Sequence, residues 1–240
     1  MVLQSRTVVR SGLTEFFRNH PHQRGIIVCP ERKFIYMKAT KTAGTSILRG
    51  ILENQIPGII HEKDHPAVFE DWLKELTDQT LADYFIFAVV RNPWDRVVSI
   101  ASYFDIPLDD FLEHFEDHNQ DPRIRIHALP LHLYTHVEGE QFCDLICRLE
   151  ALQPDMNLVF DRIGLPRQQL PFLNPSDHRP YFDSYTQGEI DRVSEIYARD
   201  IQYYGYMFDH SARNRTRGTG AKQTGLIEQL ITRLKGNQPS

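Results

Sequence analysis

The chain has 240 residues, a formal charge of −5 and a hydrophobic share of 41%. This length supports one well-filled core and is short for two domains, and the acidic balance gives no general attraction for nucleic acid. No stretch approaches the roughly eighteen apolar residues of a membrane-spanning helix, and the three cysteines and scattered histidines predict neither a disulfide framework nor a metal site.

Two apolar runs near the start, residues 25–29 and 34–37, predict a β-hairpin around Pro30 and Glu31. After the second run, apolar side chains recur at helical spacing: Ile47, Leu48, Ile51 and Leu52. The second strand therefore gives way to a helix across a turn near residues 38–46.

That turn has the composition of an anion-binding loop. Ala43 and Gly44 let backbone N–H groups approach an oxyanion, and the start of the helix adds partial positive charge. Side-chain donors flank them: Lys41, Thr42, Thr45 and Ser46. The loop is predicted to hold a doubly charged group. Taken alone, the segment also fits an ordinary strand-to-helix turn with a solvated lysine.

The spacing departs from a nucleotide-triphosphate loop, in which the lysine follows the second glycine. Here Lys41 precedes Gly44, and no aspartate ends a later apolar strand to hold magnesium. The sequence therefore predicts an anion held without a metal. A small-molecule kinase that uses ATP stays as an alternative, and so does a binding module that has lost catalysis.

A second strand-to-helix unit follows at residues 84–104. Its continuous apolar run predicts a central parallel strand buried on both faces. Arg91 ends that strand, Asn92 can cap the next helix, and Pro93 stands where a missing N–H costs nothing. The pattern buries Val97, Val98, Ala101 and Phe104 and leaves Asp95, Arg96, Ser99 and Tyr103 toward another side. Arg91 and Ser99 together suit a phosphomonoester, although Arg91 can instead pair with a carboxylate.

The rest of the chain predicts helices over residues 67–76, 108–115, 154–163 and 189–204. Residues 120–136, rich in proline and histidine, indicate a long surface loop. Residues 142–148 fit either a strand or a helix. We expect one domain over residues 1–210 and, over residues 211–240, a basic tail with a helix, which is either a solvated appendage or a flap over the site.

At the two anion segments the chain resembles the sulfotransferases that use 3′-phosphoadenosine 5′-phosphosulfate (PAPS), especially the membrane-associated carbohydrate type and its bacterial relatives. KTAGTS at residues 41–46 is similar to their 5′-phosphosulfate loop. RNPWDRVVS at residues 91–99 is similar to their 3′-phosphate site, with the same spacing between arginine and serine. RLEAL at residues 148–152 and the run at residues 189–208 are similar to later segments of that family.

The resemblance implies an α/β fold: a single three-layer α/β/α domain with a central parallel sheet and a P-loop-like anion loop. It implies transfer of a sulfuryl group from PAPS to a hydroxyl of a carbohydrate or small-molecule acceptor, without a metal. It also favours a strand at residues 142–148. Cofactor contacts are expected from Lys41, Thr42, Ala43, Gly44, Thr45, Ser46, Arg91 and Ser99. We expect no nucleic-acid partner, no stable membrane insertion and a cytoplasmic location, unlike the Golgi-anchored members.

Transfer to a hydroxyl requires charge stabilisation on the departing oxygen and removal of a proton. Lys41 is expected to provide the first, because charge grows on that oxygen as the S–O bond lengthens. Histidine suits the second at neutral pH. His65 is predicted to be catalytic, since KDHP resembles the KTHLP of cytosolic relatives. His61 is the nearest rival, and His127 in HALP resembles the histidine of an HWxP-like block.

Overall fold

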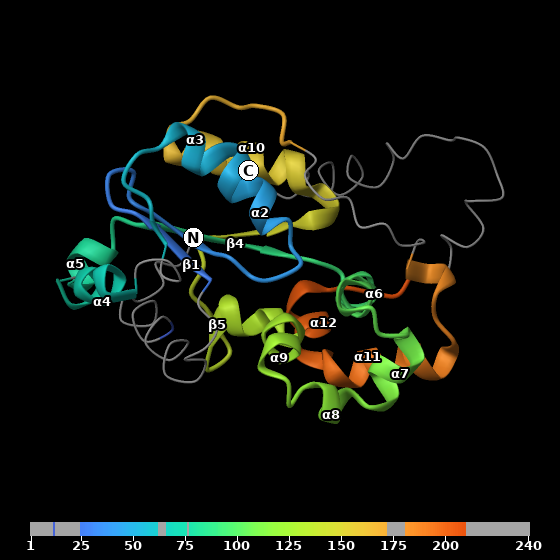
Figure 1. Ribbon diagram of the computed structural model, residues 1–240. Coiled ribbons are helices and arrows are strands. Elements are labelled where there is room, and N and C mark those ends of the chain that lie inside the picture. Colours follow the sequence, from blue (N-terminus) through green and yellow to red (C-terminus); the bar gives the residue numbers. More distant parts are fainter. Residues whose placement is uncertain (1–11, 13–24, 62–65, 76, 172–180, 210–240) are drawn as a thin grey trace, which may run out of the picture. The chain divides into compact units, whose positions relative to one another are not determined.

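The computed structural model describes residue 12 and residues 25–61, 66–75, 77–171 and 181–209 (Figure 1). By internal packing the chain divides into two units, Met1–Phe208 and Asp209–Ser240. The second unit lies almost wholly outside the described residues, and with it the basic tail and its predicted helix. The expected division near residue 210 stays a prediction.

A five-stranded sheet forms the centre of the first unit (Figure 1). Its strands are β1 (Ile26–Cys29), β2 (Phe34–Met37), β3 (Ile60–His61), β4 (Phe85–Val90) and β7 (Leu145–Arg148). They lie in the order β3-β1-β2-β4-β7, with β2, β4 and β7 parallel and β1 antiparallel to both of its neighbours. β5 (His136–Val137) and β6 (Glu140–Gln141) form a separate two-stranded ribbon.

Helical segments connect and follow the strands. They are α2 (Gly44–Ile47), η1 (Leu48–Leu52), α3 (Glu53–Gln55), α4 (Pro66–Glu75), α5 (Asp78–Leu81), α6 (Pro93–Phe104), α7 (Leu108–Glu113), α8 (Phe115–His118), α9 (Pro122–Ala128), η2 (Leu131–Tyr134), η3 (Leu149–Ala151), α10 (Leu152–Ile163), η4 (Tyr181–Asp183), α11 (Gln187–Ile196) and α12 (Ala198–Tyr204). In Figure 1, α2, α3 and α10 lie on one side of the sheet, and α6, α9 and α12 on the other.

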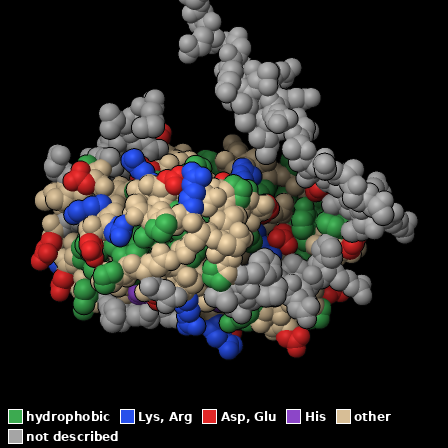
Figure 2. Space-filling model, turned by 90° about the horizontal axis from the view of Figure 1, so that it is seen from above, with side chains coloured by type: hydrophobic (Ala, Val, Ile, Leu, Met, Phe, Trp, Pro, Cys, Tyr) green, Lys and Arg blue, Asp and Glu red, His purple; other side chains and the backbone are tan. Residues whose placement is uncertain are grey.

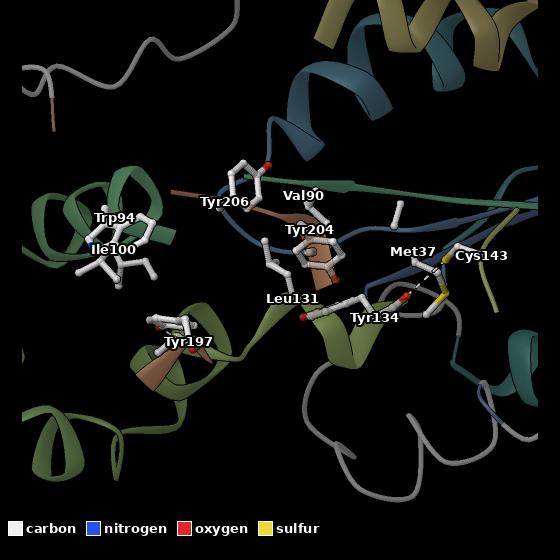
Figure 3. Packing of buried hydrophobic residues seen from close by; sticks show 14 of the residues in the cluster. Met37, Val90, Trp94, Ile100, Leu131, Tyr134, Cys143, Tyr197, Tyr204 and Tyr206 are labelled. Carbon is white, nitrogen blue, oxygen red and sulfur yellow. Dashed lines mark hydrogen bonds between the residues drawn. The ribbon is translucent and has the colours of Figure 1, made fainter. Parts of the chain in front are cut away.

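Successive side chains of each strand point to opposite faces of the sheet, and each face has its own apolar core. In β4, Ile86 and Val90 face the cluster shared with α6, whereas Phe87 and Val89 face the cluster shared with α2, η1 and α10. A strand buried on both faces must be apolar throughout, which explains its continuous apolar run. Figure 3 shows large aromatic side chains of the first cluster: Trp94, Tyr134, Tyr197, Tyr204 and Tyr206.

The predicted hairpin is present. β1 and β2 pair from Ile26 opposite Met37 to Cys29 opposite Phe34, and Lys33 in the turn has a φ of 53°. Because a turn this short cannot reverse the chain into a parallel pair, β1 runs against the other strands and the sheet is not wholly parallel. The parallel strands β2, β4 and β7 all end at one edge of the sheet.

The prediction of a long loop at residues 120–136 was wrong. Asp121 caps α9 by accepting a hydrogen bond from Arg123 N at 2.8 Å, and Pro122 occupies the first helical turn. Ile124 and Ala128 are buried. A proline that follows a capping aspartate begins a helix, which is the physical reason for the difference.

Other element predictions are confirmed with changed limits. Residues 145–148 form β7, the strand that the family resemblance favoured. The helix expected over residues 189–204 is divided into α11 and α12 at Tyr197, whose φ of −111° and ψ of 27° interrupt the helical path. The helix expected over residues 108–115 is likewise divided into α7 and α8 at His114.

Asp200 on α12 fixes the segment that follows α9. Its carboxylate is buried and accepts hydrogen bonds from Leu131 N at 2.7 Å and from the backbone N and Nδ1 of His132 at 2.8 and 2.7 Å. Tyr197 OH donates to Ala128 O at 2.8 Å. The end of α9 is therefore tied to the C-terminal helices by satisfied buried polar groups.

The surface carries both signs of charge. On the face drawn in Figure 2, basic, acidic and apolar side chains are interspersed. Within the described ranges, every helix is too short or too polar to cross a bilayer. Large apolar side chains with high exposure are Val68, Tyr103, Leu158, Tyr203 and Met207.

Candidate functional site

The loop at residues 38–46 follows β2 directly and turns tightly. Lys41 and Ala43 have φ values of 62° and 60°, a strained region for residues with a Cβ and one that clusters at ligand sites. Thr42 is fully buried, and its hydroxyl donates to Ala39 O at 2.9 Å. A Cβ at Gly44 would lie 2.9 Å from the side chain of Lys38, so a larger residue there would have to displace that side chain.

A helical path begins at the end of this loop, because α2, η1 and α3 follow one another without a break from Gly44 to Gln55. The first N–H groups of a helix have no partner within it and can bind an anion. Thr45 is exposed and Ser46 buried at this start. The predicted strand-to-helix turn is therefore present, and its binding of an anion stays a prediction.

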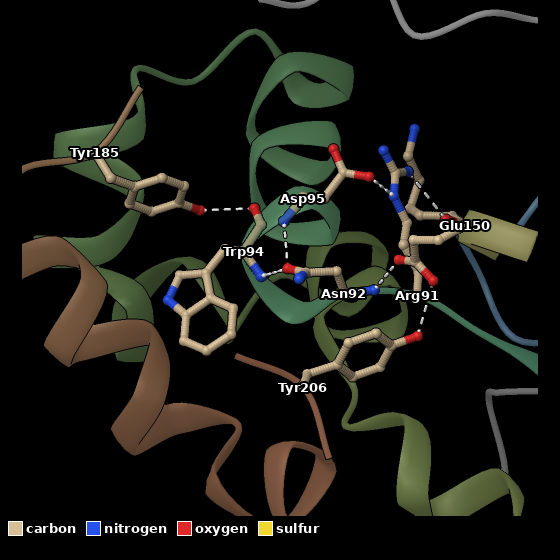
Figure 4. Close-up of polar contacts among 8 residues, drawn as sticks. Arg91, Asn92, Trp94, Asp95, Glu150, Tyr185 and Tyr206 are labelled. Carbon is tan, nitrogen blue, oxygen red and sulfur yellow. Dashed lines mark hydrogen bonds and ion pairs between the residues drawn. The ribbon is translucent and has the colours of Figure 1, made fainter. Parts of the chain in front are cut away.

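Arg91 ends β4, the neighbouring strand, and contacts the loop. Its side chain is buried; Nε donates to Asp95 Oδ2 at 2.8 Å and Nη1 donates to Lys41 O at 3.1 Å (Figure 4). The two segments predicted to bind anions thus meet at one edge of the sheet. The pairing with a carboxylate, which the sequence left open, is present as well and holds the guanidinium in place.

The turn that carries Arg91 is held by a polar network (Figure 4). Asn92 Oδ1 accepts from Trp94 N at 3.0 Å and from Asp95 N at 3.3 Å, which confirms the predicted cap. Glu150 accepts from Asn92 N at 2.6 Å and from Tyr206 OH at 3.0 Å. Sequence reasoning assigned no role to Glu150, although the RLEAL segment that contains it had been singled out.

Arg96 and Ser99 on α6 are buried, although neither belongs to the apolar side of that helix. Arg96 Nη2 donates to His127 O at 2.7 Å, and the guanidinium lies 5.8 Å from the Tyr197 ring centroid. Its Nε has no hydrogen-bond partner, and none of the carboxylates in the described segments pairs with it. A buried cation without a counter-ion is costly, and a negative charge bound nearby would lower that cost.

Lys41 is a cation of the anion loop, and its surroundings change its pKa. Its Nζ lies 4.3 Å from the centroid of the Tyr103 ring. Burial, and next the nearby cation of Arg91, lower the pKa of Lys41 to about 8. An anion bound beside it would offset both effects and favour the charged ammonium.

The three candidate histidines have different positions. His61 lies on the edge strand β3, two strands from β2, with Nε2 3.1 Å from Glu53 Oε1. His65 lies outside the described residues, and its catalytic role stays a prediction. His127 is at the end of α9, where its ring stacks on Tyr103 at 5.1 Å between centroids. Of the two candidates that the structure describes, His127 therefore is the one that lies beside the ring that Lys41 contacts.

Over the segments that the structure describes, no group of three or more histidines, cysteines or carboxylates could hold a metal ion.

A model described as the sulfotransferase family matches residues 24–207. Neither the curated proteins nor the solved structures give a match. The matched region contains the loop at residues 41–46, Arg91, Ser99 and Glu150, and it spans well over half of the chain. The chain therefore belongs to the sulfotransferase family.

Proposed function

We propose that this sulfotransferase-family protein transfers a sulfuryl group from PAPS to a hydroxyl group of a carbohydrate or small-molecule acceptor. The hydrogen bond from Arg91 Nη1 to Lys41 O supports the proposal most, because it places the two anion segments side by side. An adenylate that carries charge at both its 3′ and 5′ positions offers one anion to each segment.

The loop at residues 41–46 would hold the 5′-phosphosulfate. Backbone N–H groups from Thr42 to Ser46 and the hydroxyls of Thr45 and Ser46 are its donors. The Thr42 hydroxyl already donates to Ala39 O, so Thr42 would contribute its backbone rather than its side chain.

Arg91 and Ser99 would bind the 3′-phosphate. A guanidinium has five N–H donors, and the bond to Asp95 orients this one while a phosphate is bound. The buried guanidinium of Arg96 adds positive charge, and its Nε has no hydrogen-bond partner. These residues fit a ligand with several negative charges.

Bound PAPS supplies the sulfuryl group, and the chain supplies position and charge. The Lys41 ammonium would stabilise the 5′-phosphate oxygen as the S–O bond to it breaks. The acceptor hydroxyl must lose its proton as its oxygen bonds to sulfur.

Calorimetry and a transfer assay test the proposed function together. Adenosine 3′,5′-bisphosphate should bind without magnesium, and ATP should bind poorly. Labelled sulfate from PAPS should pass to members of a pool of sugars, lipids and metabolites. Tight ATP binding that requires magnesium would instead support a kinase, and bisphosphate binding without any transfer would support a non-catalytic binding module.

The titration of Lys41 provides a pH-dependent prediction. In the ligand-free protein this ammonium should titrate at about 8, below its ordinary value of 10.5. Adenosine 3′,5′-bisphosphate should raise that pKa, because its 5′-phosphate favours the charged lysine. By linkage, the affinity should be constant below about pH 8 and should fall as the pH rises above it.

NMR titration of ¹³C-labelled lysine side chains, with and without the bisphosphate, measures this shift. The Lys41→Met variant identifies the signal by its loss. A Lys41 pKa that the bisphosphate leaves unchanged would place the 5′-phosphate elsewhere.

A further inference from the structure

Three side chains from separate elements meet beside the anion loop. Lys41 Nζ lies 4.3 Å from the Tyr103 ring centroid, and the His127 ring stacks on the same ring at 5.1 Å with an interplanar angle of 22°. Tyr103 is 62% exposed, so this group borders solvent and an acceptor can reach it. The loop, α6 and α9 each contribute one member.

The hydrogen bond of the His127 ring determines which nitrogen can accept a proton. Nδ1 lies 2.8 Å from Arg123 O, one turn earlier on α9. A carbonyl oxygen only accepts, so Nδ1 carries the hydrogen and a neutral ring has its lone pair on Nε2. From the described part of the chain, Nε2 receives no hydrogen bond. It is therefore available to an acceptor hydroxyl.

Hydrogen bonds hold the backbone of His127, and packing holds its ring. The backbone oxygen of His127 accepts from Arg96 Nη2 at 2.7 Å and from Thr40 Oγ1 at 3.3 Å. The ring also meets Phe104 edge-on at 5.1 Å between centroids. The backbone of His127 is thus held by α6 and by the anion loop, and its ring packs against two aromatic rings of α6, which gives the pre-organisation that a proton acceptor needs.

The charges that face His127 keep it neutral. Lys38 and Lys41 approach from the loop and Arg96 from α6, and all three are cations. On its own helix, Arg123 presents a backbone carbonyl, while its guanidinium pairs with Asp121 at 2.7 Å. Burial first, and then these cations, lower the pKa of His127 below its ordinary value of 6.5. The ring is therefore in its proton-accepting form at neutral pH.

We infer that His127 takes the proton from the acceptor hydroxyl and that the Tyr103 ring positions the His127 imidazole beside Lys41. This rests on the proposed function and names the proton acceptor of the same site, in place of His65. The acceptor oxygen forms a bond to sulfur, and its proton passes to Nε2. The bond from sulfur to the 5′-phosphate oxygen breaks, and its electron pair stays on that oxygen beside Lys41.

The test is to replace His127 by Asn, whose amide can still donate to Arg123 O. With labelled PAPS and the acceptor pool, kcat should fall about 100-fold or more, while the dissociation constant of adenosine 3′,5′-bisphosphate changes less than about twofold. The acid limb of the kcat/KM profile, which lies below pH 6.5 in the wild type, should disappear. His114→Asn, at an exposed histidine paired with Asp110, is the matched control and should leave all three unchanged.

Tyr103 is tested by a pair of substitutions. Tyr103→Ala should lower kcat about tenfold and move the acid limb, because it removes the ring that contacts both Lys41 and His127. Tyr103→Phe keeps the ring and should restore both values. If Tyr103→Ala transferred sulfate like the wild type, with an unmoved acid limb, the positioning role would be refuted.

The outcomes separate this inference from the proposed function. A wild-type protein that binds no bisphosphate, or transfers no sulfate, would refute the proposed function itself. An active wild type with full turnover in folded His127→Asn and His127→Gln variants would refute only the role of His127. Loss of turnover in His65→Ala or His61→Ala with His127→Asn active would assign the proton to that other histidine. Thermal unfolding and bisphosphate titration establish that each variant is folded.

Discussion

Replacement of Lys41 by Met is expected to lower kcat by about 100- to 1,000-fold, while bisphosphate affinity falls less than about tenfold. The ammonium interacts most strongly with the 5′-phosphate oxygen as the S–O bond breaks, when the negative charge there is largest. Met keeps much of the length of the lysine side chain but has no charge to place over the Tyr103 ring. Single-turnover transfer and calorimetry separate the two effects.

Two further variants make this result specific. Lys41→Arg keeps the positive charge and should retain more turnover than Lys41→Met. Lys74→Met, at an exposed lysine paired with Asp71, should behave like the wild type. An unchanged kcat with a large loss of affinity in Lys41→Met would make Lys41 a binding residue and not a catalytic one.

Replacement of Arg91 by Ala should weaken adenosine 3′,5′-bisphosphate binding about 100-fold or more, since removing one partner of a buried charge pair costs roughly 2–5 kcal/mol. Arg91→Lys keeps a charge but lacks the planar guanidinium, so its affinity for the bisphosphate should lie between those of the wild type and Arg91→Ala. Ser99→Ala removes one neutral hydrogen-bond donor from a buried position and should lower the affinity for the bisphosphate about tenfold. Calorimetry at fixed salt measures all three.

The control for Arg91 is Arg167→Ala, which removes an exposed arginine that is likewise paired with an aspartate, Asp161. It should leave the affinity unchanged. Because Arg91 also bonds Lys41 O and Asp95, urea unfolding must show that Arg91→Ala remains folded. Wild-type affinity in a folded Arg91→Ala protein would remove the 3′-phosphate from this position.

Much of the fold followed from short-range rules. The hairpin of β1 and β2, the buried strand β4 and the cap at Asn92 each depend on residues that are close together in the chain. Turn composition, apolar alternation and capping are local properties, so a single sequence carries them.

The predictions that were wrong or incomplete depended in part on distant segments. Residues 120–136 contain α9 because Asp121 and Pro122 begin a helix and because Ile124 and Ala128 find a core to pack against, whereas the proline and histidine content alone indicated a loop. Arg96 is buried because α9 and Tyr197 cover it, a neighbour relation that helical periodicity on α6 cannot report.

The sequence by itself determined two strand-to-helix turns whose residue types suit a ligand with two separate anionic groups. Glycine, lysine and arginine at the end of a strand favour anion binding in any such turn, because their effect is local. Only the tertiary structure decided which described histidine lies beside Lys41. Bonds across long stretches of chain hold α9 in this place: Arg96 Nη2 donates to His127 O from α6, and Thr40 Oγ1 donates to His127 O from the anion loop. A histidine becomes a proton acceptor through the groups packed around it, and the order of residues does not specify those groups.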